Sequence, residues 1–179
     1  MTCAASLSSL ISCSRANLFP VDKGLKIERS IQLDMLFRSL NVYYDCTVKI
    51  GGRIVASRVH RAGSRLLVQA FSIHTEPEYG PVDDGKRYGV FVIQYGGVLT
   101  AQDIFPGNLI VAVGIIEGAR YSEITPDIRR LTIAAECVHI WRTQGAGLQE
   151  YYWSADGKYA SSIQGTFCRN EPTHAFFIS

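Results

Sequence analysis

Apolar positions along the chain fall into short runs separated by glycine, proline and aspartate, a pattern typical of a mainly β protein. Residues 30–40 are the exception, because their apolar positions recur with helical spacing and predict a short helix with Ser30 as its N-cap. Alternating or continuous apolar runs further along predict five strands. These strands cover residues 48–60, 65–73, 88–95, 109–116 and 131–141.

The first predicted strand is interrupted by Gly51 and Gly52, and a glycine pair inside a strand indicates a bulge or bend. A small closed barrel needs such a bend, because its first strand must pair with a neighbour on each side. We therefore predict a five-stranded Greek-key barrel of the OB (oligonucleotide/oligosaccharide-binding) type, with a two-sheet sandwich as the rival. Gly118 is expected to end the fourth strand, and Thr125, Pro126 and Asp127 are expected to lie in the loop before the fifth.

The C-terminal part of the chain is predicted to form a hairpin over residues 149–163, because Asp156-Gly157 stands between two aromatic-rich runs. The resulting organisation has four parts. These are a signal peptide (residues 1–12), a lipidated tether (13–29), the barrel with its short helix (30–142) and a C-terminal extension (143–179).

Composition narrows the functional classes. A hydrophobic share of 47% against a charged share of 19% excludes a disordered chain. The formal net charge of +2 is too small for the electrostatic surface of a nucleic-acid-binding protein. The chain is thus predicted to be a folded domain that does not bind nucleic acid.

The first thirteen residues resemble a bacterial lipobox. Leu10 and Ser12 stand three positions and one position before Cys13, behind an uncharged, mostly small and apolar stretch. By this resemblance Cys13 would carry the lipid, and Ser14 after it favours sorting to the outer membrane. The alternative is an ordinary N-terminal segment with a buried Cys13.

Cysteine and histidine spacing gives no metal or redox motif. Removal of the signal peptide and lipidation of Cys13 would leave Cys46, Cys137 and Cys168, whose pairing the sequence leaves open. Cys137 lies in an apolar strand and is interpreted as a buried free thiol.

Several blocks of sequence, in this order and spacing, are similar to the Slp family of Gram-negative outer-membrane lipoproteins. The blocks are residues 51–55, 65–68, 89–92, 106–118 and 138–141, preceded by Phe19-Pro20 shortly after the lipobox cysteine. The resemblance covers about residues 10–142. It departs from the family at residues 99–103, where an aspartate-proline pair is common. It implies a starvation- or stress-associated lipoprotein of the outer membrane, on its periplasmic face, without known catalytic activity.

We find no nucleophile, phosphate-binding or metalloprotease motif, so no catalytic residue, metal ligand or cofactor is predicted. Glu76, Glu78, Asp83 and Asp84 lack calcium-loop spacing and are interpreted as a polar loop. His139 is interpreted as a packed histidine rather than a ligand.

Two groups of residues are candidates for binding. Arg58, Arg61 and Arg65, around the tip of the first hairpin, are candidate contacts for an anionic ligand or lipid head group, against the alternative of a solvated hairpin tip. Tyr151, Tyr152 and Trp153 are candidates for an interface with a protein of the cell envelope, or cover the barrel.

Two functions follow. The first is a membrane-anchored binding or structural module of the cell envelope, with a place in a larger envelope or secretion complex. The second is a soluble small-ligand-binding barrel or periplasmic enzyme that uses its interior, although a barrel of five strands is normally filled by its own side chains.

Overall fold

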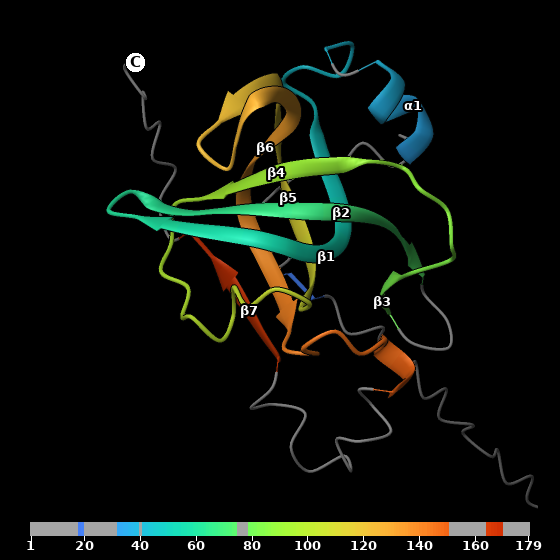
Figure 1. The fold of residues 1–179 in the computed structure, drawn as a ribbon, viewed down its shortest axis with the longest axis vertical. Coiled ribbons are helices and arrows are strands. Elements are labelled where there is room, and N and C mark those ends of the chain that lie inside the picture. Colours follow the sequence, from blue (N-terminus) through green and yellow to red (C-terminus); the bar gives the residue numbers. More distant parts are fainter. Residues whose placement is uncertain (1–17, 20–31, 40, 75–78, 151–163, 170–179) are drawn as a thin grey trace, which may run out of the picture.

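The computed structural model describes residues 18–19, 32–39, 41–74, 79–150 and 164–169, which form one rounded β structure (Figure 1). In this part of the chain lie one short helix and seven strands. They are α1 (Leu33–Arg38), β1 (Thr47–His60), β2 (Gly63–His74), β3 (Gly80–Val82), β4 (Val90–Tyr95), β5 (Leu109–Ser122), β6 (Thr125–Trp141) and β7 (Gln164–Cys168).

Five of the strands close into a ring. The order around it is β1-β5-β6-β4-β2, and β2 pairs with β1 again. All pairs in the ring are antiparallel except β4 with β6, which run parallel. This arrangement is the connectivity of the OB type, so the predicted barrel is confirmed.

Ring closure depends on the middle of β1, which pairs with two strands at once. Gly51 and Gly52 lie opposite Phe71 and Ala70 of β2 on one side, and opposite Val111 and Ile110 of β5 on the other. A side chain on Gly52 would collide with the backbone carbonyl of Gln69. The expected bend is therefore placed correctly, although the register shift of the β1–β2 pair falls later, between Ile54 and Ala56.

The interior of the ring is filled by large apolar side chains contributed by all five strands. Ile50, Phe91, Ile110 and Ile133 are completely buried in it, and Leu36 of α1 packs against the same cluster. A barrel of this size thus holds its own side chains rather than a ligand.

The hairpin of β5 and β6 is longer than predicted, and two expectations about it were wrong. Gly118 does not end β5, because a positive φ of 77° and an irregular register between Ile116 and Ala119 let the strand continue to Ser122. Thr125, Pro126 and Asp127 belong to β6. Proline is tolerated there because the pairing partner of this segment lies on one side only.

The helix is shorter than predicted. It begins at Leu33, after Gln32 in the N-cap position, and ends at Arg38. Ser30, the expected N-cap, lies outside the described residues.

Two short strands were not predicted. β3 arises within the segment expected to be a loop and pairs with the end of β2. β7 pairs with β6 beyond the point where β4 leaves it, so one edge of β6 is shared by two strands.

The prediction of a free thiol at Cys137 was wrong, because β7 brings Cys168 directly opposite it and the two form a disulfide. The disulfide could not be predicted from the sequence, because the strand that carries Cys168 was not predicted. Among the cysteines of the described residues, Cys46 is free.

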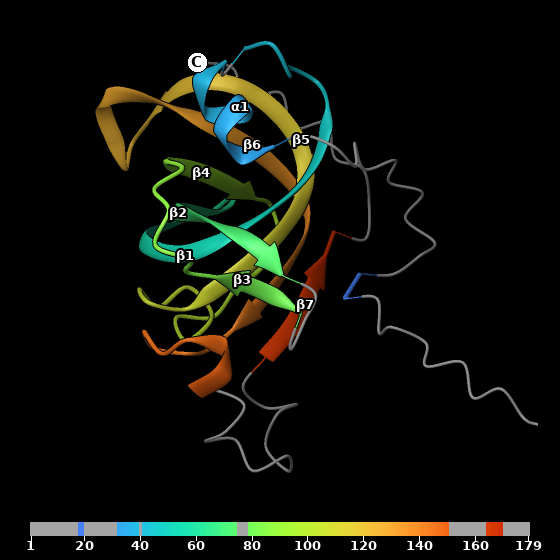
Figure 2. The same ribbon diagram turned by 90° about the vertical axis from the view of Figure 1, so that its right-hand side faces the viewer.

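A short piece of the N-terminal segment lies against the barrel. Leu18 and Phe19 pack on a second apolar cluster that includes Leu109, Trp141 and Leu148, and the hydroxyl of Thr166 in β7 donates to the carbonyl of Leu18 at 3.0 Å. Figure 2 shows this piece beside β7, on the opposite side of the barrel from the turn of the β5–β6 hairpin.

Further sequence predictions also lie outside the described residues. They are the lipidated Cys13, the aromatic residues Tyr151, Tyr152 and Trp153, and the turn at Asp156-Gly157. Within the described part of the chain, no helix is long and apolar enough to cross a membrane.

The double pairing of β1 predicts that Gly52→Ala destabilises the protein by about 2 to 3 kcal/mol, because the new methyl group meets backbone rather than a movable side chain. Urea unfolding of the full chain measures the change. Gly51→Ala should cost less, since its neighbours are the side chains of Ile73, Pro81 and Val111. Gly147→Ala, in open space, is the control. Equal stability of the Gly52 and Gly147 variants would contradict the close approach of the strands.

Candidate functional site

A pocket of about 500 Å³ lies beside the tips of two hairpins. One tip is the two-residue turn Arg61-Ala62 between β1 and β2, and the other is the turn Glu123-Ile124 between β5 and β6. The remaining walls come from β5 and β6, from the end of β4, from Arg169 directly after β7 and from the segment before β1. The residues lining the pocket include His60, Arg65, Gln94, Tyr95, Gly96, Glu123, Glu136 and Arg169.

Three basic side chains of the β1–β2 hairpin converge on the carboxylate of Glu123. Arg65 lies 3.2 Å from Oε1, and Arg58 and His60 each lie 3.3 Å from Oε2. The side chains of Arg58 and Glu123 are about half exposed, whereas that of Arg65 is 22% exposed. The two hairpin tips are thus held together by ion pairs, with two arginines facing one carboxylate.

The structure brings two of the three predicted arginines together at Glu123, and of the three only Arg65 lines the pocket. Arg58 and Arg65 both contact Glu123, and Arg61 lies exposed in the turn between them. The side chain of Arg58 is 54% exposed and that of Arg65 is 22% exposed, so the two alternatives for the arginines stay open.

His60 adds an unsatisfied nitrogen. Its Nε2 is covered by neighbouring atoms, and no hydrogen-bond partner for it exists among the described residues. The 3.3 Å contact with Glu123 is short enough for an ion pair but lacks hydrogen-bond geometry. A covered donor or acceptor without a partner usually costs stability, so its presence beside a pocket is a sign of a binding site.

A second polar group lies elsewhere in the pocket lining, where β4 and β7 end. The backbone N–H of Arg169 donates to the carbonyl of Glu136 at 2.9 Å, and the Arg169 guanidinium lies over Gly96. Burial raises the pKa of Tyr95 above its usual value, with Arg169 opposing the shift and Glu136 adding to it. The pocket therefore carries both signs of charge beyond the Glu123 cluster.

His139 is packed, as predicted. It is 5% exposed, its Nδ1 lies 2.6 Å from the hydroxyl of Thr166, and its ring meets Trp141 edge-on. Burial lowers the pKa of His139, and the hydrogen bond from its Nε2 to Oε1 of Gln164 opposes this shift. This histidine joins β6 to β7 and has a structural role.

The carboxylate of Asp84, in the predicted polar loop, is engaged within its own turn. It accepts from the backbone N–H of Lys86 at 3.0 Å and from Ser72 and Tyr88 at 3.3 Å. Glu76 and Glu78 lie outside the described residues. Among the described residues, no group of three or more histidine, cysteine or acidic side chains is placed to hold a metal ion.

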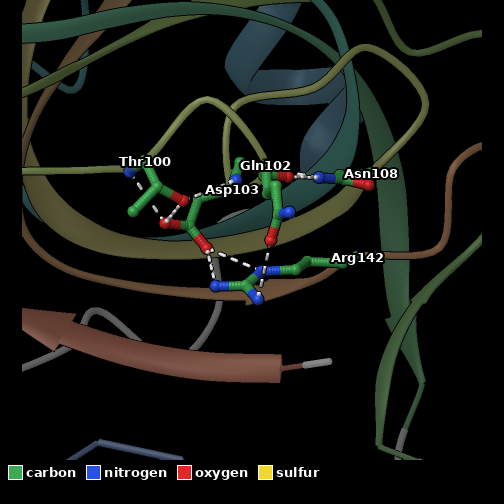
Figure 3. A network of polar contacts seen from close by, with 5 residues as sticks. All are labelled: Thr100, Gln102, Asp103, Asn108 and Arg142. Atoms are coloured by element: carbon green, nitrogen blue, oxygen red, sulfur yellow. Dashed lines mark hydrogen bonds and ion pairs between the residues drawn. The ribbon is translucent and has the colours of Figure 1, made fainter. Parts of the chain in front are cut away.

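A buried network ties the connection between β4 and β5 to the end of β6 (Figure 3). One oxygen of Asp103 accepts from the backbone N–H and hydroxyl of Thr100, and the other accepts from Nε and Nη2 of Arg142 at 2.9 and 2.8 Å. The Nδ2 group of Asn108 donates to the carbonyls of Gln102 and Asp103. This network occupies the stretch in which the sequence departs from the family's aspartate-proline pair.

The Asp103 network is structural, because its carboxylate is 2% exposed and both of its oxygens are occupied from within the chain. Burial raises the pKa of Asp103, but the hydrogen bonds from Thr100 and Arg142 outweigh it, so the pKa lies below its usual value.

Glu123, Glu136 and Arg169 were missed from the sequence. Glu123 is separated from Arg58 by 65 positions, and only the strand order of the ring brings the two hairpin tips together. The sequence signal available for Glu123 was its charge, in the connection between the fourth and fifth predicted strands. The sequence alone could not place this connection next to the first hairpin.

A known protein family matches most of the chain. The family model described as "Outer membrane lipoprotein Slp family" matches residues 10–169. The match runs past residue 142, where the sequence resemblance was expected to end, and includes β7. No curated protein matches the chain.

The lowered pKa of Asp103 predicts how stability responds to acid. A group whose pKa is depressed by folding stabilises the folded state fully above its unfolded pKa of about 3.9, and the contribution is lost as pH falls through the folded pKa. Asp103→Asn should therefore lower the free energy of unfolding at pH 7 by about 3 kcal/mol, and the gap to the wild type should narrow only below about pH 4.

Urea unfolding between pH 7 and pH 3 measures this gap, with the exposed Asp127→Asn as the control. A gap that narrows already between pH 7 and pH 5 would show that Asp103 is not the group with the depressed pKa.

Proposed function

Because the chain belongs to the Slp family of outer membrane lipoproteins, we propose that it is a non-enzymatic binding module, tethered by a lipid on Cys13 to the periplasmic face of that membrane. It binds an anionic ligand in the pocket beside the hairpin tips. The observation that carries the proposal is the convergence of Arg58, His60 and Arg65 on Glu123, since Glu123, His60 and Arg65 line that pocket.

The tether is supported by the position of Cys13 in the chain. Cys13 stands five residues before Leu18, which packs near β7, so its Cα lies at most about 18 Å from that of Leu18. The lipid therefore enters the membrane on the β7 side of the barrel.

We expect the hairpin tips to face away from the membrane, although Arg169, directly after β7, also lines the pocket. Leu109, at the start of β5, belongs to the cluster on which Leu18 packs, whereas Ser122, at its other end, adjoins the turn that carries Glu123. A strand of 14 residues separates these two ends by up to roughly 40 Å. This geometry favours a ligand of the periplasm over the head groups of the anchoring membrane, the other contact considered for Arg58, Arg61 and Arg65.

The rival function, a soluble barrel or enzyme that works through its interior, has less support. The interior is occupied by completely buried side chains such as Phe91 and Ile133. Of the small residues of the central strands, Ala134 lines the external pocket.

Protein partners remain a separate prediction. Tyr151, Tyr152 and Trp153 are expected to contact another envelope protein, and membership of a larger envelope or secretion complex depends on that contact. The prediction of ligand binding in the pocket does not depend on the prediction of a protein partner, so one can be wrong while the other holds.

The tether predicts that Cys13→Ser moves the protein out of the outer-membrane fraction, because the thiol that carries the lipid is lost. Fractionation of a Gram-negative host and intact-mass analysis of the purified chain measure this. Cys46→Ser is the matched control, since Cys46 is a free thiol in the barrel domain. An unlipidated wild-type chain in the outer membrane would contradict the role of Cys13.

The binding site predicts that the full chain binds small anions at the hairpin tips. On titration with acetate and phosphate, amide NMR shifts should change at residues 58–65 and 123, and replacing Arg58, Arg61 and Arg65 together by Gln should abolish the changes. Replacing Arg38 and Arg87 by Gln, away from the pocket, serves as control. Shift changes that survive the triple replacement would refute the site.

A further inference from the structure

Resting on the binding site proposed above, we propose that Glu123 is a built-in substitute for the carboxylate of the ligand. A carboxylate-bearing ligand enters the pocket, takes the place of Glu123 among Arg58, His60 and Arg65, and releases the β5–β6 tip from the β1–β2 tip. The bound and free states then differ in whether the two hairpins are joined.

The contacts of Glu123 describe the group that would replace it. Its two oxygens divide the basic side chains, Arg65 on Oε1 and Arg58 with His60 on Oε2. Two acceptor oxygens in one plane, each facing its own donors, are what a carboxylate offers to arginine. The cluster is therefore matched to a carboxylate.

His60 favours replacement of Glu123 by the ligand, because the ligand can form a hydrogen bond that Glu123 does not form. Its Nε2 is covered, at 3.3 Å from Glu123, without a hydrogen bond among the described residues. The position of the Glu123 carboxylate is constrained by its turn. A ligand that approaches from the pocket has no such constraint, so it can align an oxygen with this nitrogen. A hydrogen bond absent from the unliganded protein is then formed.

Release of Glu123 costs little. Its side chain is 50% exposed, and ion pairs exposed to solvent contribute little to stability. Among the described strands, the outer part of the hairpin, residues 119–130, pairs only within the hairpin, since the contact of β6 with β4 begins at Leu131. The backbone N–H of Ala119 also donates to Oδ1 of Asn41. The tip can therefore move without opening the ring.

The pocket leaves room for the rest of the ligand. A volume of about 500 Å³ is within the range of small-molecule sites. Gln94, Glu136 and Arg169 line it together with Gly96, whose lack of a side chain makes room for the Arg169 guanidinium. These groups suit a polar body such as a short peptide or a sugar, the two sources from which the carboxylate can come.

Calorimetric titration of the full chain in detergent tests the exchange. The probes are an acetylated tri-alanine peptide with a free carboxylate, the same peptide as its C-terminal amide, glucuronate and inorganic phosphate. Glu123→Gln, which removes the internal competitor, should bind the carboxylate probes at least about fivefold more tightly than the wild type, and Arg65→Gln at least about fivefold more weakly. Asp127→Asn removes an acidic charge from the same hairpin outside the pocket and should leave the affinity unchanged.

The peptide and glucuronate arms distinguish the two sources, and the amide should not gain affinity from Glu123→Gln. If Glu123→Gln binds carboxylates no more tightly than the wild type, the proposal that a ligand carboxylate replaces Glu123 is overturned. Stronger binding of phosphate than of either carboxylate would also overturn it. If the wild type binds carboxylates through its arginines but Glu123→Gln gains nothing, the binding site stands and this inference alone fails. If removal of the arginines has no effect, the proposed function fails as well.

Discussion

The structure depends on one constraint, the double pairing of β1 with β2 and β5 around Gly51 and Gly52. Without it the five strands form an open sheet with two edges. With it they enclose an interior of completely buried side chains such as Ile50 and Phe91, which leaves no place inside for a ligand. A binding function must then use the outside of the barrel, where hairpins extend beyond the ring.

Closure also separates the two ends of the longest strands. β5 and β6 run from the cluster that holds Leu18 and Phe19 to the turn that carries Glu123. At the first end, β7 occupies the edge of β6 that β4 leaves free and is fixed there by the disulfide between Cys137 and Cys168. One end thus serves attachment in the proposed function, and the other offers a polar pocket.

Local patterns predicted the ring well, because each of its strands is an apolar run bounded by turn residues and Gly51-Gly52 marks the bend. They failed where context decides the structure. Pro126 is in a strand because its neighbours pair on one side only, and Cys137 is bonded because the short, polar β7 lies beside it. The same limit applies to the site: Arg58, Arg61 and Arg65 form a visible basic cluster, but Glu123 joins it only through strand order.

The most direct test of the account is the orientation of the barrel on a membrane. The full chain, with Cys46 replaced by Ser, is labelled with a fluorophore at Ala62→Cys in the hairpin turn or at Gly147→Cys beside Leu148, and reconstituted into vesicles that contain a head-group quencher. We predict strong quenching at position 147 and little at position 62, because position 147 adjoins Leu148 of the cluster on which Leu18 packs, whereas position 62 lies at the hairpin tips. Stronger quenching at position 62 would place the hairpin tips on the membrane and contradict the account.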